Sequence, residues 1–300
     1  MDGRVKPGHD GSWMGSNLTR VTTRASGLIV TADDFGAALE VNEAVDRAHR
    51  DGILSCASLM VGSSAAGDAV ARAKTMPKLG VGLHLVLVEG KPVLPPSQIP
   101  NLVGPDGNFR TDMVKAAIAM TFLPWVQRQL AAEIEAQFEA FAATGLKLDH
   151  VNAHKHFHLH PTIAKLMLMI GKRYGLKAAR APIEPPELLR RIEPNTSGGD
   201  LERFMGTRLR ERFTVNSIWS PDAVFGLAWS GAMDARRVAG LLENLPEGVS
   251  EIYLHPALCA YKGSAPGYRY SDELTALLAP EAIGLAGQVR RGTFADFAGG

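Results

Sequence analysis

Two adjacent carboxylates, Asp33 and Asp34, end an apolar stretch of β-forming residues, LIVTADDFG. Neighbouring carboxylates at the end of a buried strand repel each other unless a cation or a proton lies between them. A metal ion bound by one carboxylate, with the other free to act as a base, would relieve this repulsion. The alternative is an acid pair that favours the N-terminus of a following helix. The pair by itself leaves both interpretations open.

Histidines supply further candidate ligands. His84 lies within VGLHLVL between apolar residues, where a lone histidine is commonly a packed core or rim residue, so it is a candidate only if other ligands end nearby. The segment DHVNAHKHFHLHP is rich in histidine, with His150, His154, His156, His158 and His160. If this segment is extended, alternation places His154, His156 and His158 on one side. At most two of them can bind the same ion as Asp34 and His84.

The mixed carboxylate and imidazole types favour a catalytic metal site over a structural one. Three such ligands leave coordination positions open, whereas a structural zinc site normally has further Cys or His ligands, and the chain has no C-x-x-C motif. A metal ion can polarise an amide carbonyl and acidify a water molecule, from which Asp33 would take the proton as general base.

Two later residues complete the candidate site. His255, at the end of EIYLHP, is the expected proton donor to a leaving amine, with a core or helix-capping histidine as the alternative. Arg180, in LKAARAP, would orient Asp33 or bind substrate, or else form a surface ion pair. We expect Arg180, His156 and His158 to be the substrate-binding residues.

The elements that must position these residues alternate between strand and helix. Apolar runs predict strands at 27–34, 53–62, 81–87, 146–153, 176–182 and 251–256. Helical spacing predicts helices near 41–48, 65–76 and 111–145, from Pro161 onward, at 234–245 and from Ser271 onward. Breaker residues predict a loop at 88–109 and irregular structure at 183–232.

This alternation predicts a single α/β domain with parallel strands covered by helices. An irregular, TIM-like (β/α) barrel is favoured over an open doubly wound sheet because candidate site residues follow several separate strands, and barrels place their sites at that rim. The glycine-rich signatures of dinucleotide and phosphate-loop sites are missing, so a nucleotide cofactor has no support.

Composition and charge narrow the surroundings. The 300 residues carry a formal net charge of +1 without a block of like charge, which argues against nucleic acid as a partner. The two cysteines, Cys56 and Cys259, exclude a disulfide framework and are expected to be buried hydrophobes in a reducing cytoplasm. No apolar run is long enough to span a membrane. Residues 1–26 are polar and Gly-rich and are expected to be a disordered extension of a domain at 27–300.

The motifs TADDFG, GLHLVL, HVNAHKHFH, ARAP and YLHP, in this order, resemble the YdjC-like carbohydrate deacetylases. The resemblance covers nearly everything from residue 27 onward. It implies an irregular (β/α) barrel and a divalent metal ion, Zn²⁺ or Mg²⁺, as the cofactor. It also implies Asp34, His84 and His154 as metal ligands, Asp33 as the catalytic base and His255 as the proton donor. Asn152 departs from the pattern, because many members carry an acid there, so no supporting role is carried over to it.

The resemblance also suggests a substrate. The insert VEGKPVLPPSQIPNLVGPDGNF (88–109) looks most like the branch associated with hopanoid biosynthesis, HpnK, which implies an N-acetylglucosaminyl hopanoid as the substrate. An apolar groove lined by 113–127 and by Trp219, Phe225 and Trp229 would then be expected, although these residues could equally pack a helix onto the barrel. The alternatives are deacetylation of a soluble chito-oligosaccharide, a metal-dependent sugar isomerase and a sugar-binding module. Contact with a membrane surface and a homo-oligomer are left open.

Overall fold

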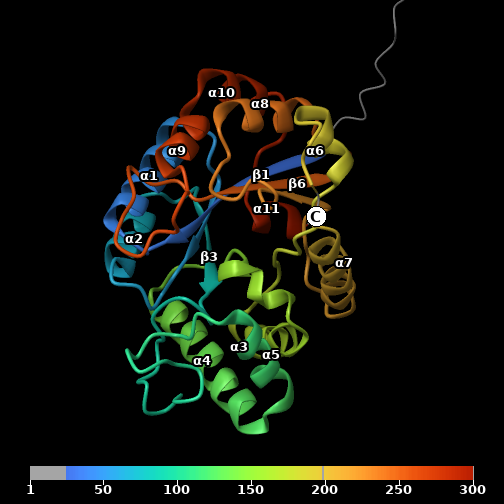
Figure 1. The fold of residues 1–300 in the computed structure, drawn as a ribbon. Helices are drawn as coiled ribbons and strands as arrows, with labels where there is room; N and C mark the ends of the chain where they lie inside the picture. The colour runs from blue at the N-terminus through green and yellow to red at the C-terminus, as the bar shows by residue number, and fades with distance from the viewer. Residues whose placement is uncertain (1–24, 198, 300) are drawn as a thin grey trace, which may run out of the picture.

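The structure is a computed structural model that describes residues 25–197 and 199–299. Its centre is a six-stranded parallel sheet in the order β4-β3-β2-β1-β6-β5 (Figure 1). The strands are β1 (Gly27–Phe35), β2 (Cys56–Leu59), β3 (Gly80–Leu85), β4 (Val151–Ala153), β5 (Ala223–Phe225) and β6 (Val249–Leu254). Every residue of β1 is buried, as expected for a central strand with both faces covered.

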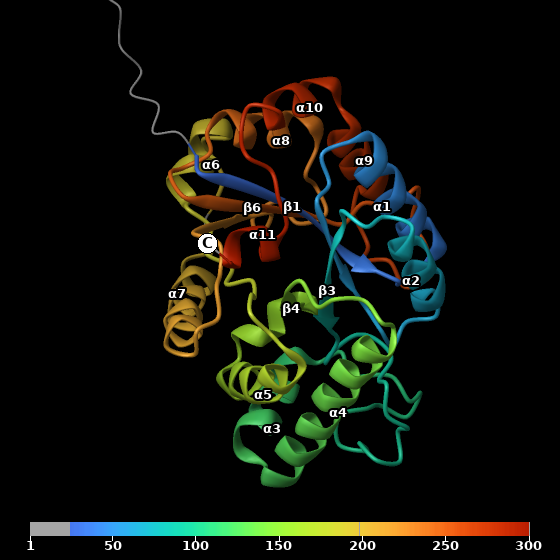
Figure 2. The ribbon, with the colours of Figure 1, turned by 180° about the vertical axis from the view of Figure 1, so that it is seen from behind.

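Most helices lie around the outside of the sheet, whereas the short α11 packs against its inner face (Figures 1 and 2). The α-helices are α1 (Leu39–Asp51), α2 (Ala66–Lys74), α3 (Met113–Phe122), α4 (Pro124–Ala143), α5 (Pro161–Gly171), α6 (Pro186–Ile192), α7 (Asp200–Val215), α8 (Ala235–Glu243), α9 (Tyr270–Leu278), α10 (Pro280–Ala286) and α11 (Phe294–Ala298). Two 3₁₀ segments are η1 (His154–Leu159) and η2 (Lys172–Tyr174). Within the described residues no helix has both the length and the apolar character that crossing a membrane requires.

The sheet curls into a half-barrel. Beyond β4, isolated parallel bridges join Val151 to Ala179 and Ala178 to Trp219. Trp219 lies shortly before β5, which forms the opposite edge of the sheet. The expected α/β class and parallel alternation are confirmed, but six regular strands do not make a complete TIM barrel. The segment 176–182, predicted as a strand, forms only isolated bridges. Its few backbone hydrogen bonds join it to Val151 on one side and to Trp219 on the other.

The helices form where apolar residues recur at helical spacing. In α1 the buried residues Val41, Ala44, Val45 and Ala48 make one stripe against the sheet. The predicted helix at 111–145 is instead two helices. Proline lacks an amide proton and disfavours helical geometry in the residue before it, so α3 ends where Leu123 turns extended and Pro124 begins α4.

Three other expectations are corrected. The region 183–232 is not irregular throughout, since it contains α6, α7 and β5; α7 buries few side chains and gave a weak apolar pattern. Two further helices, α10 and α11, follow α9. Cys259 is exposed, whereas Cys56 is buried as expected. The predicted extension, residues 1–26, lies outside the described residues except for its last two, of which Ser26 donates its amide to the Gly248 carbonyl at 2.9 Å.

Candidate metal centre and catalytic site

A distortion at the end of β1 turns both carboxylates toward the same histidine. Neighbouring side chains of a regular strand point to opposite faces. Here the pairing with β2 shifts register between Ala32 and Phe35, and Asp34 adopts φ 62°, a left-handed conformation that few residues other than glycine adopt. As a result Asp33 Oδ1 lies 4.0 Å from His84 Nδ1, and Asp34 Oδ1 lies 3.4 Å from His84 Nε2. Such local strain is typical of functional sites.

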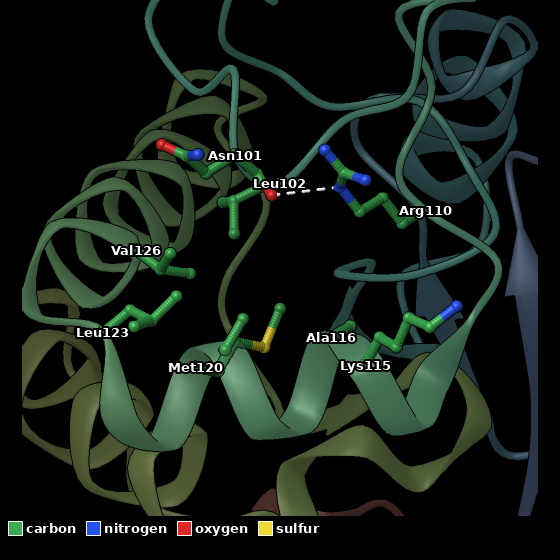
Figure 3. A pocket seen from close by; sticks show the side chains of 9 residues that line it. Asn101, Leu102, Arg110, Lys115, Ala116, Met120, Leu123 and Val126 are labelled. Atoms are coloured by element: carbon green, nitrogen blue, oxygen red, sulfur yellow. Dashed lines mark hydrogen bonds between the residues drawn. The ribbon is translucent and has the colours of Figure 1, made fainter.

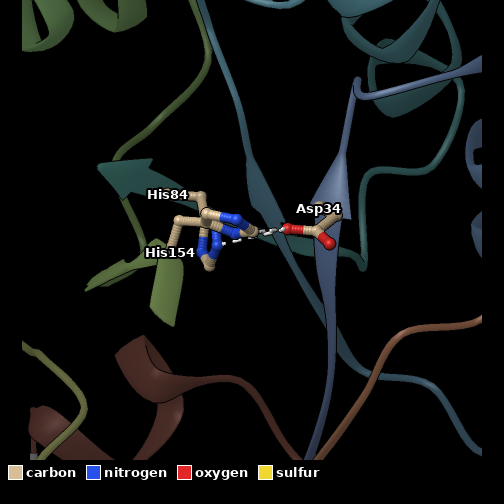
Figure 4. A group of neighbouring side chains, drawn as sticks. All are labelled: Asp34, His84 and His154. Atoms are coloured by element: carbon tan, nitrogen blue, oxygen red, sulfur yellow. Dashed lines mark hydrogen bonds and ion pairs between the residues drawn. The ribbon is translucent and has the colours of Figure 1, made fainter. Parts of the chain in front are cut away.

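Asp34, His84 and His154 lie together as the sequence predicted, and we call these three residues the metal group (Figure 4). One ligand atom from each lies within 4.8 Å of the others, and His154 Nδ1 is 3.2 Å from Asp34 Oδ1. His84 Nε2 is buried and has no hydrogen-bond partner. An unpaired buried nitrogen beside a carboxylate and a second imidazole is the donor set that Zn²⁺ or a similar divalent ion binds. The residues therefore fit a metal ion.

Asp33 has a different environment. Arg180 donates from Nη1 to Asp33 Oδ2 at 2.6 Å and from Nη2 to Oδ1 at 3.0 Å, and also bonds Glu251 from Nη2 at 2.7 Å. Burial alone would raise the pKa of Asp33, but the Arg180 charge and then His84 outweigh it and hold the pKa well below its usual value. Arg180 itself is completely buried, so its predicted surface ion pair is excluded and its contact is with Asp33.

The hydrogen-bond partners of His84 decide which of its ring nitrogens carries the proton. His84 Nδ1 lies 2.7 Å from the Oδ1 of Asn152, whose Nδ2 donates to Asp33 Oδ1 at 3.0 Å. Because a carboxylate only accepts, the amide nitrogen of Asn152 must face Asp33 and its oxygen must face His84. His84 Nδ1 is then the donor, which leaves the Nε2 lone pair for a metal ion. Burial lowers the pKa of His84, yet Asp33 and Asp34 raise it above its ordinary value overall.

The histidine-rich segment is not extended, so the predicted alternation of His154, His156 and His158 on one side is wrong. The segment forms η1, with Lys155 and His156 at positive φ of 55° and 51°, and the three rings meet different partners. His156 Nε2 lies 2.8 Å from the Tyr253 hydroxyl, and His158 Nε2 lies 2.9 Å from the Arg180 carbonyl. Burial lowers the pKa of His158 to about 3, so it is neutral at physiological pH.

An aromatic wall borders the site on the side of β6. Successive ring pairs at 5.2–5.9 Å connect five residues, His156, Tyr253, His255, Tyr268 and Tyr270. His255 is half-buried, its Nδ1 has no hydrogen-bond partner, and its charge helps to lower the pKa of both Asp33 and Asp34. The structure thus brings His255 to the carboxylates from a separate strand.

Comparisons with known proteins identify related sequences and a related structure. A family model described as YdjC-like protein matches residues 27–285. The chain belongs to the YdjC-like family. Proteins named carbohydrate deacetylase resemble it: one from Brevibacillus brevis is 39% identical over 54% of this chain and 60% of its own length, and one from Geobacillus stearothermophilus is 28% identical over 85% and 90%. A Vibrio vulnificus protein of the same name is 36% identical over 49% of this chain and 56% of its own length.

The chain therefore spans little more than half the length of the Brevibacillus and Vibrio relatives. Among solved structures, a protein of Enterococcus faecalis V583, named for a suggested cleavage of cellobiose phosphate, covers 91% of this chain and 99% of its own with a TM-score of 0.72. Because its sequence is only 22% identical, it supports only the fold of this YdjC-like protein and not its function.

Sequence reasoning missed two polar residues that support the site of this YdjC-like protein. Glu251 is completely buried and bonds Arg180; a lone acid in the apolar strand EIYLHP was the available signal. Asn152 holds Asp33 and His84, a role that the departure from the family pattern did not suggest. A second group of metal-type side chains, Cys56, Asp149 and His150, lies at the amino ends of β2 and β4, beside α11. Its polar atoms already bond one another and the α11 backbone.

Proposed function

We propose that this chain is a metal-dependent carbohydrate N-deacetylase, which hydrolyses the amide bond of an N-acetylated sugar. Asp34, His84 and His154 would hold the divalent ion, Asp33 would be the base and His255 the acid. The observation that carries the proposal is that the adjacent carboxylates have different hydrogen-bond partners: Asp34 lies within 3.4 Å of two imidazoles, whereas Asp33 bonds Arg180 and Asn152 and lies 4.0 Å from His84. Two carboxylates with separate partners can take two separate roles.

The residues divide the chemistry in a consistent way. A bound divalent ion would supply a Lewis acid that polarises the amide carbonyl and makes a water molecule more acidic. Asp33 would take a proton from that water while the water oxygen forms a bond to the carbonyl carbon. When the carbon–nitrogen bond breaks, His255 would give a proton to the departing amine. Arg180 keeps Asp33 ionised and fixes its orientation, and Asn152 fixes it from the other side.

Two features support a sugar as the substrate. The aromatic wall offers the half-buried Tyr268 beside His255, and tyrosine rings present flat apolar faces with a polar tip. Relatives of 28–39% identity are named carbohydrate deacetylases. Asp34 and His154 are the more exposed members of the metal group, at 10% and 17% of their side chains, so substrate would approach from their side.

For the sugar carrier, we favour a glycolipid such as an N-acetylglucosaminyl hopanoid. Four large apolar side chains on α3 and the start of α4 are at least half exposed: Val114, Ile118, Phe122 and Trp125. Such a cluster is typical of a surface that contacts lipid or protein. Behind it, α3, α4 and residues 101–110 enclose a pocket of about 230 Å³ lined mainly by apolar groups, including Leu102, Met120 and Val126 (Figure 3). Of the predicted groove residues, Phe225 and Trp229 are buried.

Acetate release and metal content test the reaction. The purified protein, loaded with Zn²⁺ or Mg²⁺, is incubated with diacetylchitobiose and with the acetylated glycolipid in vesicles. We expect Asp33→Asn to keep the metal and lose most turnover, and His84→Ala and His154→Ala to lose the metal. His160→Ala is the matched control, since His160 bonds Thr121 on α3 and does not belong to the metal group. A fully active Asp33→Asn, or unchanged metal content in both histidine variants, would contradict the proposal.

The same assay separates the alternatives. Turnover of the soluble sugar alone would refute the glycolipid and leave a chito-oligosaccharide deacetylase. Rearrangement of a sugar without acetate release would indicate an isomerase. Binding of sugar without any turnover would indicate a binding module.

A further inference from the structure

A buried chain of hydrogen bonds runs along the strands from the metal group to the amino end of β4. It begins at His84 and passes through Asn152 to Ser58, whose Oγ accepts from Asn152 Nδ2 at 2.9 Å. Ser58 Oγ is 3.0 Å from His150 Nε2, and His150 Nδ1 is 2.9 Å from Asp149 Oδ2. Ser58, Asn152 and His150 are completely buried.

The far end of this chain is anchored. The Asp149 carboxylate accepts the backbone amides of Phe294 at 3.3 Å and Ala295 at 3.0 Å, at the start of α11. Phe294 stacks on the His150 ring with centroids 4.1 Å apart. On the opposite side, Gly82 of β3 leaves room for the ring, because a Cβ atom there would lie 2.5 Å from it. His150 is therefore held tightly, although it lies outside the metal group.

The directions of these bonds follow from the two carboxylates. Asp149 and Asp33 only accept, so His150 donates from Nδ1 and Asn152 donates from Nδ2. With Nδ1 carrying the ring proton, His150 accepts the Ser58 hydroxyl proton at Nε2, and Ser58 accepts the second amide proton of Asn152. Every donor has one acceptor, and the Asn152 oxygen is left facing His84 Nδ1.

We propose that Ser58 and His150 are positioning residues that hold the Asn152 amide and thereby keep His84 in the form with its Nε2 lone pair free for the metal ion. This inference rests on the proposed metal site. Partners behind a histidine ligand commonly change metal affinity or activity by about 10- to 100-fold when they are removed. Asn152 also retains Asp33 as an anchor, so the expected loss on removing Ser58 lies at the lower end.

The test compares two buried serines that lie three residues apart, Ser55 and Ser58. Ser58→Ala removes the bond to Asn152, whereas Ser55→Ala removes a hydroxyl that bonds the Val30 backbone and no residue of the metal group. Zn²⁺ dissociation constants are measured by competition with a chromophoric chelator, and unfolding midpoints are measured on the same samples. We expect Ser58→Ala to weaken Zn²⁺ about tenfold and Ser55→Ala to lower the midpoint without weakening Zn²⁺. Equal affinity of Ser58→Ala and wild type, or equal weakening in both variants, would overturn the inference.

Two further measurements bear on the path itself. The double variant Ser58→Ala/His150→Gln should lose no more Zn²⁺ affinity than the single variant that binds Zn²⁺ more weakly, because both substitutions act through the Ser58–Asn152 hydrogen bond. If the two losses multiply, the residues do not share one path. In the metal-free protein at alkaline pH, the ¹⁵N resonances of the His84 ring should show Nδ1 protonated in wild type and a mixture of forms in Ser58→Ala. An unchanged pattern contradicts the inference. If Ser58→Ala does not fold, Ser58→Cys, a weaker donor of similar size, replaces it.

The inference and the proposed function fail in different ways. Wild-type protein that binds no metal and releases no acetate refutes the proposed function and this inference with it. Wild-type protein that binds metal and turns over substrate, while Ser58→Ala keeps full affinity, refutes the positioning role alone.

Discussion

Replacement of Arg180 by methionine should be severely destabilising. Arg180 is completely buried between Asp33 and Glu251, and it also lies over the Tyr253 ring at 4.3 Å. Methionine fills part of the volume but leaves two buried carboxylates without their cation. Removing one partner of a buried ion pair costs about 3–5 kcal/mol, and here two carboxylates lose the same partner. We therefore expect the metal-free protein to lose at least about 4 kcal/mol of unfolding free energy, a large part of the ~5–15 kcal/mol typical of a domain.

The pH dependence gives this prediction a sign. In wild type the pKa of Asp33 is below its ordinary 3.8, so its contribution to stability is present above that value and is lost as pH falls through the folded pKa. Without Arg180, burial should raise the pKa of Asp33 above its unfolded value. Protonation then favours the folded state, so the variant should regain stability relative to wild type as pH falls from about 7 toward 5.

Urea unfolding with a chelator present, at several pH values, measures both effects. Arg72→Met is the matched control, because Arg72 pairs with Glu43, Asp46 and Asp68 on a partly exposed surface. Surface pairs contribute roughly 0–1 kcal/mol, so this control should change little. A loss below about 1 kcal/mol in Arg180→Met, or a difference from wild type that does not depend on pH, would show that the buried charges are not coupled as described.

Three further predictions use the same protein. Chelation of a bound divalent ion should lower the unfolding midpoint, since an ion at 100 times its Kd stabilises by about 2.7 kcal/mol; an unchanged midpoint in a calorimetric scan argues against the site. His255→Gln should reduce kcat far more than it changes KM in the acetate assay, because a proton donor acts as the amine leaves; a change in KM alone argues for substrate binding only. The pKa of His158 is depressed to about 3, so its contribution to stability is present above the unfolded value of 6.5 and is lost as pH falls toward 3. In urea titrations, His158→Gln should therefore reduce the loss of unfolding free energy between these two pH values. An unchanged loss would assign it to other groups.

The sequence predicted much of the fold and the metal group because both follow local rules. The buried run of β1 and the stripe of α1 follow from periodicity, and ligand candidates at the ends of parallel strands meet because those ends lie along one edge. Asp34, His84 and His154 were accordingly found together. Pro124 was a signal in the sequence for the end of one helix and the start of the next. The apolar pattern continues on both sides of it, so a single helix was predicted at 111–145.

Only the tertiary structure decided which partners the side chains of the site contact. The left-handed Asp34 and the kink after His154 depend on the fit of distant segments, and no local pattern predicts two consecutive positive φ values at Lys155 and His156. The partners of Asp33 come from positions more than a hundred residues away. The sequence by itself determined which chemical groups are present and at which strand ends. The packing of the curled sheet decided which carboxylate meets imidazoles and which meets arginine, because hydrogen bonds inside a closed core are set by three-dimensional neighbours rather than by sequence spacing.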